Sequence, residues 1–466
     1  MLFNTVQYFL FFALILMLFY ASHGVLRKWI LLIASYSFYA SWNWKFVPLL
    51  LTLTVIDYSA ALWMARVRAD RRKLFLLVSV MANLTFLGFF KYYNFLAGNA
   101  AELLGMHPSS YTLAIVLPLG ISFHTLQSIS YVVDVYRGEQ KAIKSPLDYA
   151  LFICFFPQLV AGPIVRARVF FRDLYNWRAP SSEERTAGIL MIVLGLIKKM
   201  AFADQFALVS DSYFNSFARQ PGMLTAWCGS IAFTLQIYFD FSGYTDIAIG
   251  SAKLLGFHFP ANFNRPFLAP SITDLWRRWH ISFSTWLRDY IYVPLASGRR
   301  GDLAIYRNLL ITMTLGGLWH GASWNFVIWG LYNGALLSWE RVWRVWQRRR
   351  PAGEDVVDLH ALRVARTFFL FVLGAPFFRL HAFEDAFQVL QRMFSGSGGT
   401  LLFNSWQIGL ILISLMVAQA EEKLGWFERL VKGPAWTYAA ALTLGLLCLE
   451  LFAVTETQVP FVYFQF

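Results

Sequence analysis

Long apolar stretches recur along the whole chain and are separated by short polar or basic segments. A helix needs about 20 mostly apolar residues to cross the hydrocarbon core of a bilayer. Stretches of about this length lie at 3–20, 29–44, 46–64, 74–90, 111–132, 187–209, 226–250, 364–380, 401–419 and 435–454. The pattern predicts an all-α, polytopic membrane protein.

One further apolar stretch, 309–340, is longer than a single crossing requires and carries one histidine, His320. As a helix it would extend about 48 Å at about 1.5 Å per residue, which is enough for two short crossings. Two glycines precede the histidine, and the small residues Gly321–Ser323 follow it. Because small residues allow a helix to break around a site, we expect a break at His320.

Basic residues between the apolar stretches indicate the orientation, because short cytoplasmic loops carry an excess of Lys and Arg. The residues that mark the cytoplasmic side are Arg27, Lys28, Arg66, Arg68, Arg71, Arg72, Lys73, Arg341, Arg344, Arg348, Arg349, Arg350, Arg363 and Arg366. The loops near 91–110, 210–225 and 381–400 carry few basic residues. Both termini are therefore expected on the outer face.

Two segments, 148–165 and 258–308, break the alternation of crossings. The first is apolar but has basic residues on both sides and is interrupted by Pro157, Gly162 and Pro163, which favours a re-entrant or broken element. The second interleaves arginines with tryptophans and tyrosines, as interfacial helices do. Such elements line cavities.

The composition supports this picture: 58% of the 466 residues are hydrophobic and 14% are charged. The net charge of +13 is explained by the excess of Lys and Arg in cytoplasmic loops and does not indicate a surface that binds nucleic acid. The three scattered cysteines indicate neither a disulfide framework nor a cysteine metal site. The first apolar stretch lacks a basic start and a cleavage site, which favours a retained span. We expect one membrane domain over 1–466.

Two of the histidines in apolar or interfacial segments, His320 and His280, are the candidate catalytic residues. An ionisable residue inside the membrane is costly and marks a functional site, and we expect His320 to act in catalysis. Trp319, Trp324 and Ser323, with neighbouring small residues, are expected to form a close-fitting niche around it. His280 follows Arg277 and Arg278 in an interfacial segment, where it could take part in the chemistry or simply meet lipid headgroups.

The remaining charged residues have both plain and functional interpretations. Anionic lipid explains most of the arginines, whereas Arg277, Arg278 and Arg288 are candidates for binding a phosphate-bearing donor. Asp240 lies in a predicted span, and we expect it to pair with a lysine of the preceding span, with cavity lining as the alternative. Metal binding is not indicated, because neither histidine has a second ligand at suitable spacing.

Two long motifs resemble those of the membrane-bound O-acyltransferase family: LWRRWHISFSTWLRDYIYVPL (275–295) and YRNLLITMTLGGLWHGASWNFVIWG (306–330). The resemblance is closest to the bacterial branch that includes the alginate O-acetylation protein and the D-alanyl transferase of teichoic acid, and it runs through the whole chain. It implies a catalytic role for His320 and a second functional role for His280. The fold it implies is a ring of tilted helices with re-entrant elements around a central cavity with two funnels.

The chain's last residues, TETQVPFVYFQF, resemble the aromatic ending found in relatives and in small partner proteins of the teichoic-acid branch, where a tyrosine can carry the acyl group. Tyr463 is therefore a candidate acyl shuttle. The alternative is an aromatic anchor at the membrane interface, which is what Tyr and Phe usually provide there.

The resulting hypothesis is a bacterial inner-membrane O-acyltransferase, most simply an O-acetyltransferase. It would use acetyl-CoA, or an acyl carrier protein, from the cytoplasm and feed O-acetylation of an extracytoplasmic polysaccharide with a periplasmic SGNH-type partner. No bound cofactor is expected. The alternative is a transporter of a small polar molecule or glycan precursor, although the paired broken helices of many transporters are missing from the pattern.

Overall fold

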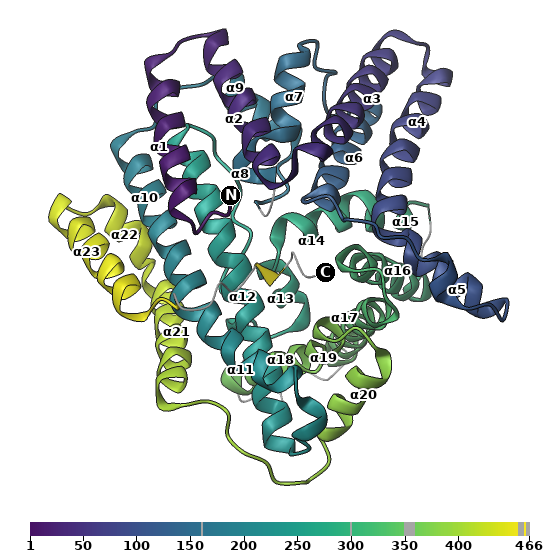
Figure 1. Ribbon diagram of the computed structural model, residues 1–466, viewed down its shortest axis with the longest axis vertical. Coiled ribbons are helices and arrows are strands. Elements are labelled where there is room, and N and C mark those ends of the chain that lie inside the picture. The colour runs from purple at the N-terminus through teal and green to yellow at the C-terminus, as the bar shows by residue number, and fades with distance from the viewer. Residues whose placement is uncertain (160–161, 299–300, 349–358, 455–460, 463–466) are drawn as a thin grey trace. The chain divides into compact units, whose positions relative to one another are not determined.

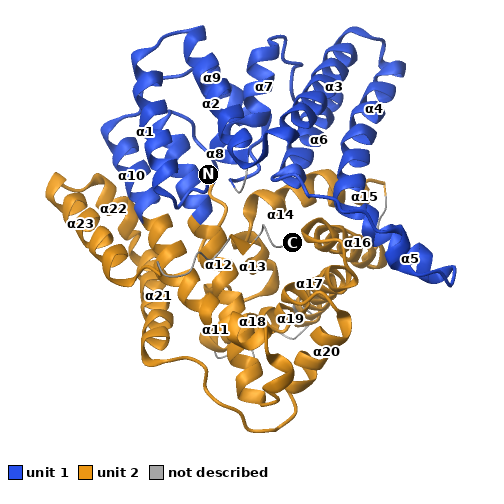
Figure 2. Ribbon diagram, in the orientation of Figure 1, with its two compact units in different colours: residues 1–193, 244–260 blue, residues 194–243, 261–466 orange. Residues whose placement is uncertain are grey.

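The computed structural model describes residues 1–159, 162–298, 301–348, 359–454 and 461–462 (Figure 1). All of the long elements are helices. The chain forms two compact units (Figure 2): unit 1 holds residues 1–193 and 244–260, and unit 2 holds residues 194–243 and 261–466. Each unit is built from two segments of the chain, so the chain passes between the units more than once. The single domain expected over 1–466 stays a prediction.

Unit 1 is built mainly from the first ten α-helices. Its elements are α1 (Val6–Ala21), α2 (Val25–Asn43), η1 (Trp44–Phe46), α3 (Val47–Arg66), α4 (Ala69–Leu87), η2 (Gly88–Tyr92), α5 (Tyr93–Leu103), η3 (Pro108–Tyr111), α6 (Ile121–Arg137), α7 (Pro146–Cys154), α8 (Phe156–Leu159), α9 (Ala167–Tyr175) and most of α10 (Ser182–Leu196).

Unit 2 holds the segments that carry the candidate chemistry. Its elements are η4 (Ile197–Ala203), α11 (Asp204–Phe214), η5 (Phe217–Arg219), the first part of α12 (Met223–Leu254), η6 (Pro266–Leu268), α13 (Ile272–Arg278), α14 (Ile281–Leu287), η7 (Arg288–Tyr292), α15 (Val293–Ala296), α16 (Asp302–His320), α17 (Trp324–Arg348), α18 (His360–Val372), α19 (Ala375–Arg379), α20 (Phe383–Arg392), α21 (Ser405–Leu424), α22 (Trp426–Lys432) and α23 (Ala435–Phe452).

Within the described residues, five helical stretches are long and apolar enough to cross a membrane. They are Val25–Arg66, Ala69–Leu103, Ser182–Phe214, His360–Arg379 and Ala435–Phe452. Many of their side chains are exposed on the surface of the protein, as expected where a helix contacts lipid. In Ala435–Phe452, only 6% of the residues are buried. The predicted class, an all-α multi-pass membrane protein, is confirmed. The ring of tilted helices with two funnels stays an expectation from the resemblance.

Most predicted crossings correspond to helices, but the prediction at 111–132 is wrong in its first half. The helix α6 begins only at Ile121, after Gly120 in the left-handed region at φ 70°. Pro118 lacks a backbone N–H and restricts the residue before it, so the chain stays irregular until the glycine turn. The apolar composition of residues 112–119 is therefore not enough to make them helical.

The interruption expected within 148–165 is confirmed. The apolar stretch divides into α7 (Pro146–Cys154) and the short α8 (Phe156–Leu159). Phe152, Phe155 and Phe156 in this stretch are completely buried, and the ring of Phe155 lies 4.8 Å from that of Phe257. Irregular backbone is tolerated at membrane depth when protein covers it, and unit 1 provides that cover.

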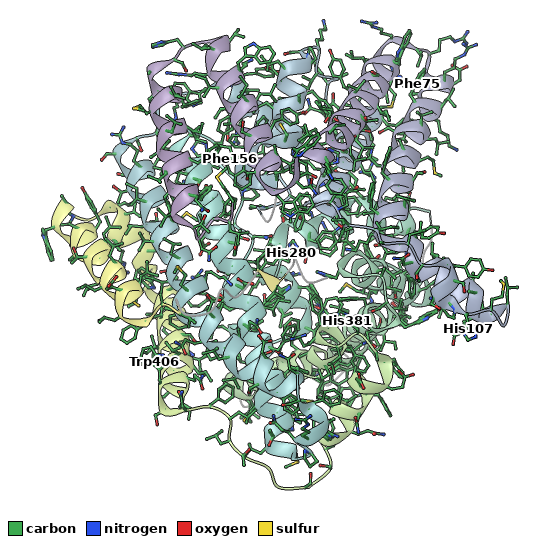
Figure 3. The ribbon with its side chains drawn as sticks, viewed as in Figure 1. Phe75, His107, Phe156, His280, His381 and Trp406 are labelled. Carbon is green, nitrogen blue, oxygen red and sulfur yellow. The ribbon has the colours of Figure 1, made fainter. Side chains whose placement is uncertain are left out.

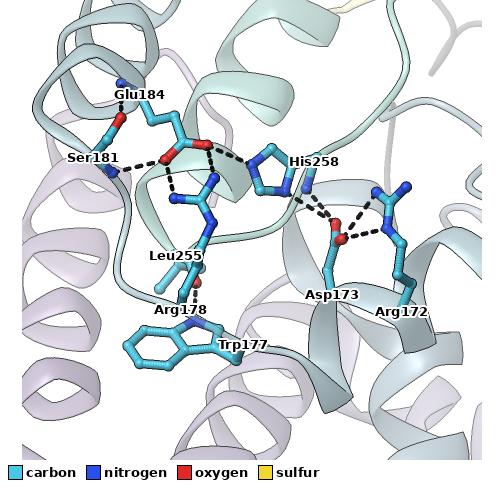
Figure 4. A network of polar contacts seen from close by, with 8 residues as sticks. All are labelled: Arg172, Asp173, Trp177, Arg178, Ser181, Glu184, Leu255 and His258. Atoms are coloured by element: carbon cyan, nitrogen blue, oxygen red, sulfur yellow. Dashed lines mark hydrogen bonds and ion pairs between the residues drawn. The ribbon is translucent and has the colours of Figure 1, made fainter.

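A polar network joins the end of α9 to the start of α10 in unit 1 (Figure 4). His258 lies between two carboxylates, with Nδ1 3.3 Å from Asp173 Oδ2 and Nε2 2.9 Å from Glu184 Oε1. Glu184 also accepts two hydrogen bonds from the Arg178 guanidinium, at 2.7 and 2.9 Å. The network fixes the residues that follow α12 against these two helices of the same unit.

Candidate active site

His320 is the last residue of α16, and the helix ends there because Gly321 is extended, with φ −162° and ψ 153°. The next helix, α17, begins at Trp324. The break predicted around His320 is therefore confirmed. His320 is only 5% exposed, so its imidazole lies inside the protein at a helix end.

Two glycines allow α16 and α17 to approach to backbone contact. A Cβ atom on Gly317 would overlap the carbonyl oxygen of Phe326, and one on Gly330 would overlap the carbonyl oxygen of Met313. Small residues at such interfaces let membrane helices come this close. The position of His320 is thus set by two helices that fit together at their backbones.

Gly317→Ala is expected to destabilise unit 2 by about 1–3 kcal/mol, because the added methyl group must push α17 away. It should also lower activity by displacing His320. The matched control is Gly409→Ala in α21, where a Cβ atom would meet nothing within 4 Å. This substitution should leave the stability unchanged or stabilise the helix by up to about 1 kcal/mol. Thermal unfolding in detergent measures both, and equal midpoints would contradict the glycine contact.

His280, labelled in Figure 3, lies between α13 and α14. Its backbone is unusual, at φ 42° and ψ 53° in the left-handed region. Such a conformation is strained for a non-glycine residue, by about 1–3 kcal/mol, and recurs at functional sites. The residue is completely buried. Its Nδ1 lies 3.3 Å from Asn262 Oδ1, which also accepts from the backbone N–H and the hydroxyl of Ser282. Because this oxygen accepts, Nδ1 of His280 carries the proton and Nε2 is left as the basic nitrogen.

The two histidines lie in one aromatic cluster, with ring centroids 6.5 Å apart. Trp319 stands beside both, at 5.9 Å from His280 and 5.0 Å from His320. Phe283 stacks on Trp319 at 4.3 Å, and Phe378 lies 5.0 Å from His320. The structure thus brings together residues that are 40 positions apart, in a setting from which water is largely excluded.

A small cavity of about 20 Å³ borders His320, and Thr234, Trp279 and Trp329 are among its lining residues. This volume holds about one water molecule or a group of similar size. A hydroxyl or a carbonyl oxygen is of that size. The cavity therefore has room for one such group beside His320.

Of the predicted niche residues, Trp319 lies against the His320 ring at 5.0 Å but does not line the small cavity, and Trp324 points elsewhere. Trp324 is 56% exposed. It lies two positions before the buried Phe326, which is about 200° around a helix, so it falls on the opposite face of α17. Ser323 lies in the break after His320, and its hydroxyl oxygen is buried, but neither it nor Asp240 lines the small cavity.

A second, much larger cavity of about 800 Å³ lies in unit 2 and is lined by residues of α13, α14, η7, α16 and α17. Four arginines line it: Arg277, Arg288, Arg341 and Arg344. Thr312 and Met313 of α16 also line it, and Met313 precedes His320 by seven residues, or about 10 Å of helix. Ile281, the neighbour of His280, borders it as well. A basic cavity therefore borders α16, which ends at His320, and α14, which begins directly after His280.

Arg278, the third predicted donor-binding arginine, is not among the residues that line this cavity. Its guanidinium forms ion pairs with Asp274 at 2.7 Å and Glu422 at 3.2 Å. The hydrogen bonds from Arg278 hold the pKa of the Glu422 carboxyl below its ordinary value. Arg278 thus joins α13 to α21, whereas its neighbour Arg277 faces the cavity.

The expected lysine partner of Asp240 is Lys199, at 3.0 Å. Lys199 also pairs with Asp204 at 2.7 Å, whereas the adjacent Lys198 donates to the hydroxyl of Ser242. The prediction of a buried Lys–Asp pair is confirmed. The candidate shuttle Tyr463 lies outside the described residues, but the two residues before it are described and buried.

Sequence reasoning missed two parts of this site. Asn262 orients His280 from 18 residues away, and nothing in its surroundings in the sequence marks it. Arg341 and Arg344 were assigned to the cytoplasmic surface charge, yet they line the large cavity. Their spacing of three places both on one helix face, next to the apolar residues of α17, and this was the signal available. Among the described residues, no group of three or more His, Cys, Asp or Glu could hold a metal ion.

The site belongs to a polytopic membrane protein that buries a pair of histidines beside a basic cavity. The sequence model of the membrane-bound O-acyltransferase family matches residues 68–380, about two thirds of the chain, and the chain belongs to this family. The resemblance to this family that the sequence motifs predicted is thereby confirmed.

Individual relatives agree with this assignment. The chain is 41% identical to the probable alginate O-acetylase AlgI of Pseudomonas syringae over 90% of its own length and 80% of the relative's. It is 37% identical to a peptidoglycan O-acetyltransferase of Helicobacter pylori, over 82% and 76% of the two chains. A teichoic acid D-alanyltransferase of Bacillus subtilis is 30% identical over 50% and 60%. The predicted function, a membrane O-acetyltransferase, is confirmed, and the transporter alternative is not favoured.

Proposed function

We propose that this enzyme moves an acetyl group from a cytosolic thioester across the bacterial inner membrane, for O-acetylation of an extracytoplasmic polysaccharide, with His320 as the general base. The observation that carries the proposal is the buried pair His280–His320, 6.5 Å apart beside a cavity the size of a reacting group. The test is acetyl transfer by the purified protein and its His320 variants.

His320 would take the proton of an acceptor hydroxyl, for which a group with a pKa near neutrality is suited. The hydroxyl oxygen then attacks the thioester carbonyl carbon and forms the ester C–O bond. The C–S bond breaks, and the thiolate leaves with its electron pair and receives the proton from the imidazolium. Proton and charge balance without any further reactant.

His280 would orient the thioester or stabilise the developing oxyanion. Asn262 holds its ring through Nδ1, which supports a fixed position rather than a mobile one. The strained backbone of His280 also supports a positioned group, because strain of this kind persists only where the surroundings enforce it.

Acetyl-CoA is the donor that fits the large cavity best. Guanidinium groups match phosphates bidentately, and four arginines line a space of about 800 Å³. Arg341 and Arg344 follow the predicted cytoplasmic end of 309–340, which supports entry from the cytoplasm. An acyl carrier protein is the alternative donor and would present a single phosphate with its pantetheine arm.

Arg277→Ala is expected to raise the apparent donor KM about tenfold with little change in kcat, because it removes ground-state binding. Arg278→Ala is the matched neighbour: its ion pairs lie away from the cavity lining, so its donor KM should change less. Initial rates over a range of acetyl-CoA concentrations measure both. An unchanged KM in Arg277→Ala would assign this arginine to lipid.

The acceptor side is proposed from the relatives. Alginate and peptidoglycan are the polymers in the names of two of them, and both are extracytoplasmic glycans with free hydroxyls. A periplasmic SGNH-type transferase would pass the acetyl group to the polymer, and both termini would face the periplasm. The test is to measure acetylation of the secreted polysaccharide in cells that lack the gene for this enzyme, in cells that lack the gene for the periplasmic transferase, and in cells that have both.

Tyr463 is proposed as the residue that accepts acetyl under His320 and presents it on the outer side. The placement of the residue before it supports this role, because Val462 is buried in the same apolar cluster as Trp279 and Trp329. Both of these tryptophans line the cavity at His320.

A further inference from the structure

Lys199, Asp204 and Asp240 form a buried ion cluster in unit 2. All three residues are at most 3% exposed, and Lys199 Nζ lies 2.7 Å from Asp204 Oδ1 and 3.0 Å from Asp240 Oδ1. Buried charges in a membrane protein are costly and mark functional sites. The family reaction derived above makes no use of this cluster.

The cluster has a second contact, with the end of the chain. The other oxygen of Asp240, Oδ2, accepts a hydrogen bond of 2.7 Å from the backbone N–H of Val462. With all three groups ionised the cluster carries one positive and two negative charges, so a further donor stabilises it. Hydrogen bonds from N–H groups to carboxylates are about twice as strong as neutral ones.

The chain that leads to Val462 is also attached beside the cluster. After α23, the backbone N–H of Val454 donates to the carbonyl oxygen of Met200 at 3.2 Å, and Met200 is the residue next to Lys199. Phe461 and Val462 are 0% and 2% exposed. The same part of η4 therefore holds the C-terminal segment at one point directly and at a second through Asp240.

Phe461 lies one side chain away from His280, and Val462 belongs to the buried cluster that borders His320. The Phe461 ring is 5.9 Å from that of Phe241, and the Phe241 ring is 4.7 Å from that of His280. Val462 belongs to the same buried cluster as Trp329, which lies 5.4 Å from His320. Displacing these residues would loosen the walls around both imidazoles.

We propose that Asp240 is a positioning residue: its carboxylate, held by Lys199, binds the backbone N–H of Val462 and so docks the C-terminal segment of the chain against the walls of the histidine site. The effect on turnover rests on the proposed function, whereas the docking itself does not. Neither Asp240 nor Lys199 contacts the reacting atoms in this proposal.

Asp240→Asn removes the hydrogen bond to Val462 while keeping the size of the side chain. Lysine is a donor only, so the single amide oxygen of the substituted side chain must face Lys199, and the amide NH₂ is then opposed to the N–H of Val462. The bond to the chain end is lost although the side chain keeps its shape. Asp204→Asn is the matched control, since it removes a charge from the same cluster without touching Val462.

Val462→Pro tests the same bond from its other side, because proline has no backbone N–H. Val462→Ala is its control: it keeps the N–H and removes two methyl groups. We expect Asp240→Asn and Val462→Pro each to lower turnover at least tenfold, and the double variant to be no worse than either. Val462→Ala should stay within threefold of the wild type.

Hydrogen exchange of the C-terminal peptide measures docking without any assay of the reaction. Faster exchange in Asp240→Asn than in the wild type and in Asp204→Asn would support the proposal, even if acetyl transfer had another basis. Equal exchange in Asp240→Asn and Asp204→Asn would overturn it, because the cluster would then be only structural. Additive losses of turnover in the double variant would overturn it as well.

Discussion

Replacing His320 with alanine is expected to lower acetyl transfer by about 10²–10⁴-fold, the range typical for loss of a general base. The imidazole is buried at the end of α16, next to a cavity that holds one small group, and the described residues that line this cavity include no second histidine. Release of acetate or transfer from radiolabelled acetyl-CoA by purified protein in detergent measures the effect.

His320→Gln is the companion variant, because alanine leaves a void that could disturb the aromatic rings around it. Glutamine fills much of the space and can form hydrogen bonds, but it is not a base at neutral pH. Both variants should unfold within a few degrees of the wild type and be equally inactive. Activity near the wild-type value in a folded His320→Gln would refute general-base catalysis by this residue.

Tyr463→Phe is expected to abolish polymer acetylation, because it deletes the phenolic oxygen proposed to carry the acetyl group while keeping the aromatic ring. If the ring only anchors the chain end at the interface, the variant should work normally. Incubation with radiolabelled acetyl-CoA, followed by denaturing electrophoresis, tests for the covalent ester directly. The wild type should carry label, and Tyr463→Phe and His320→Gln should not.

Tyr111→Phe serves as the control for this labelling experiment. Tyr111 is 44% exposed and follows a loop that the sequence assigns to the outer side, so it could be modified nonspecifically. Label that persists in Tyr463→Phe and disappears in Tyr111→Phe would show that the ester forms by chance on an accessible phenol.

The parts of the fold that depend on local composition could be predicted from the sequence. Apolar length alone located most helices, and the run of small residues after His320 marked the break between α16 and α17. The limit appears at residues 112–119, where apolar side chains accompany irregular backbone. The hydrophobicity of this segment indicates that it lies in an apolar environment, whereas its conformation depends on Pro118 and Gly120.

The parts of the site that depend on distant contacts could not be predicted in this way. The left-handed backbone of His280 and its bond to Asn262 arise only when α13, α14 and the segment before them fold together. Arg277 and Arg278 are adjacent in the sequence, yet only Arg277 lines the cavity, because the carboxylate that pairs with Arg278 comes from α21. No spacing rule within one helix separates them.

The glycine contact between α16 and α17 has a consequence for how a reaction can be carried out across a membrane. Helices that touch backbone to backbone at Gly317 and Gly330 leave little room for either to tilt, so we expect His320 at their junction to stay in one place. Under the proposed function, the two reactants would then have to reach it from opposite sides of the membrane. Such a protein needs no alternating exposure of its site to the two sides. In that mechanism only the acetyl group, rather than the catalyst, would change compartment.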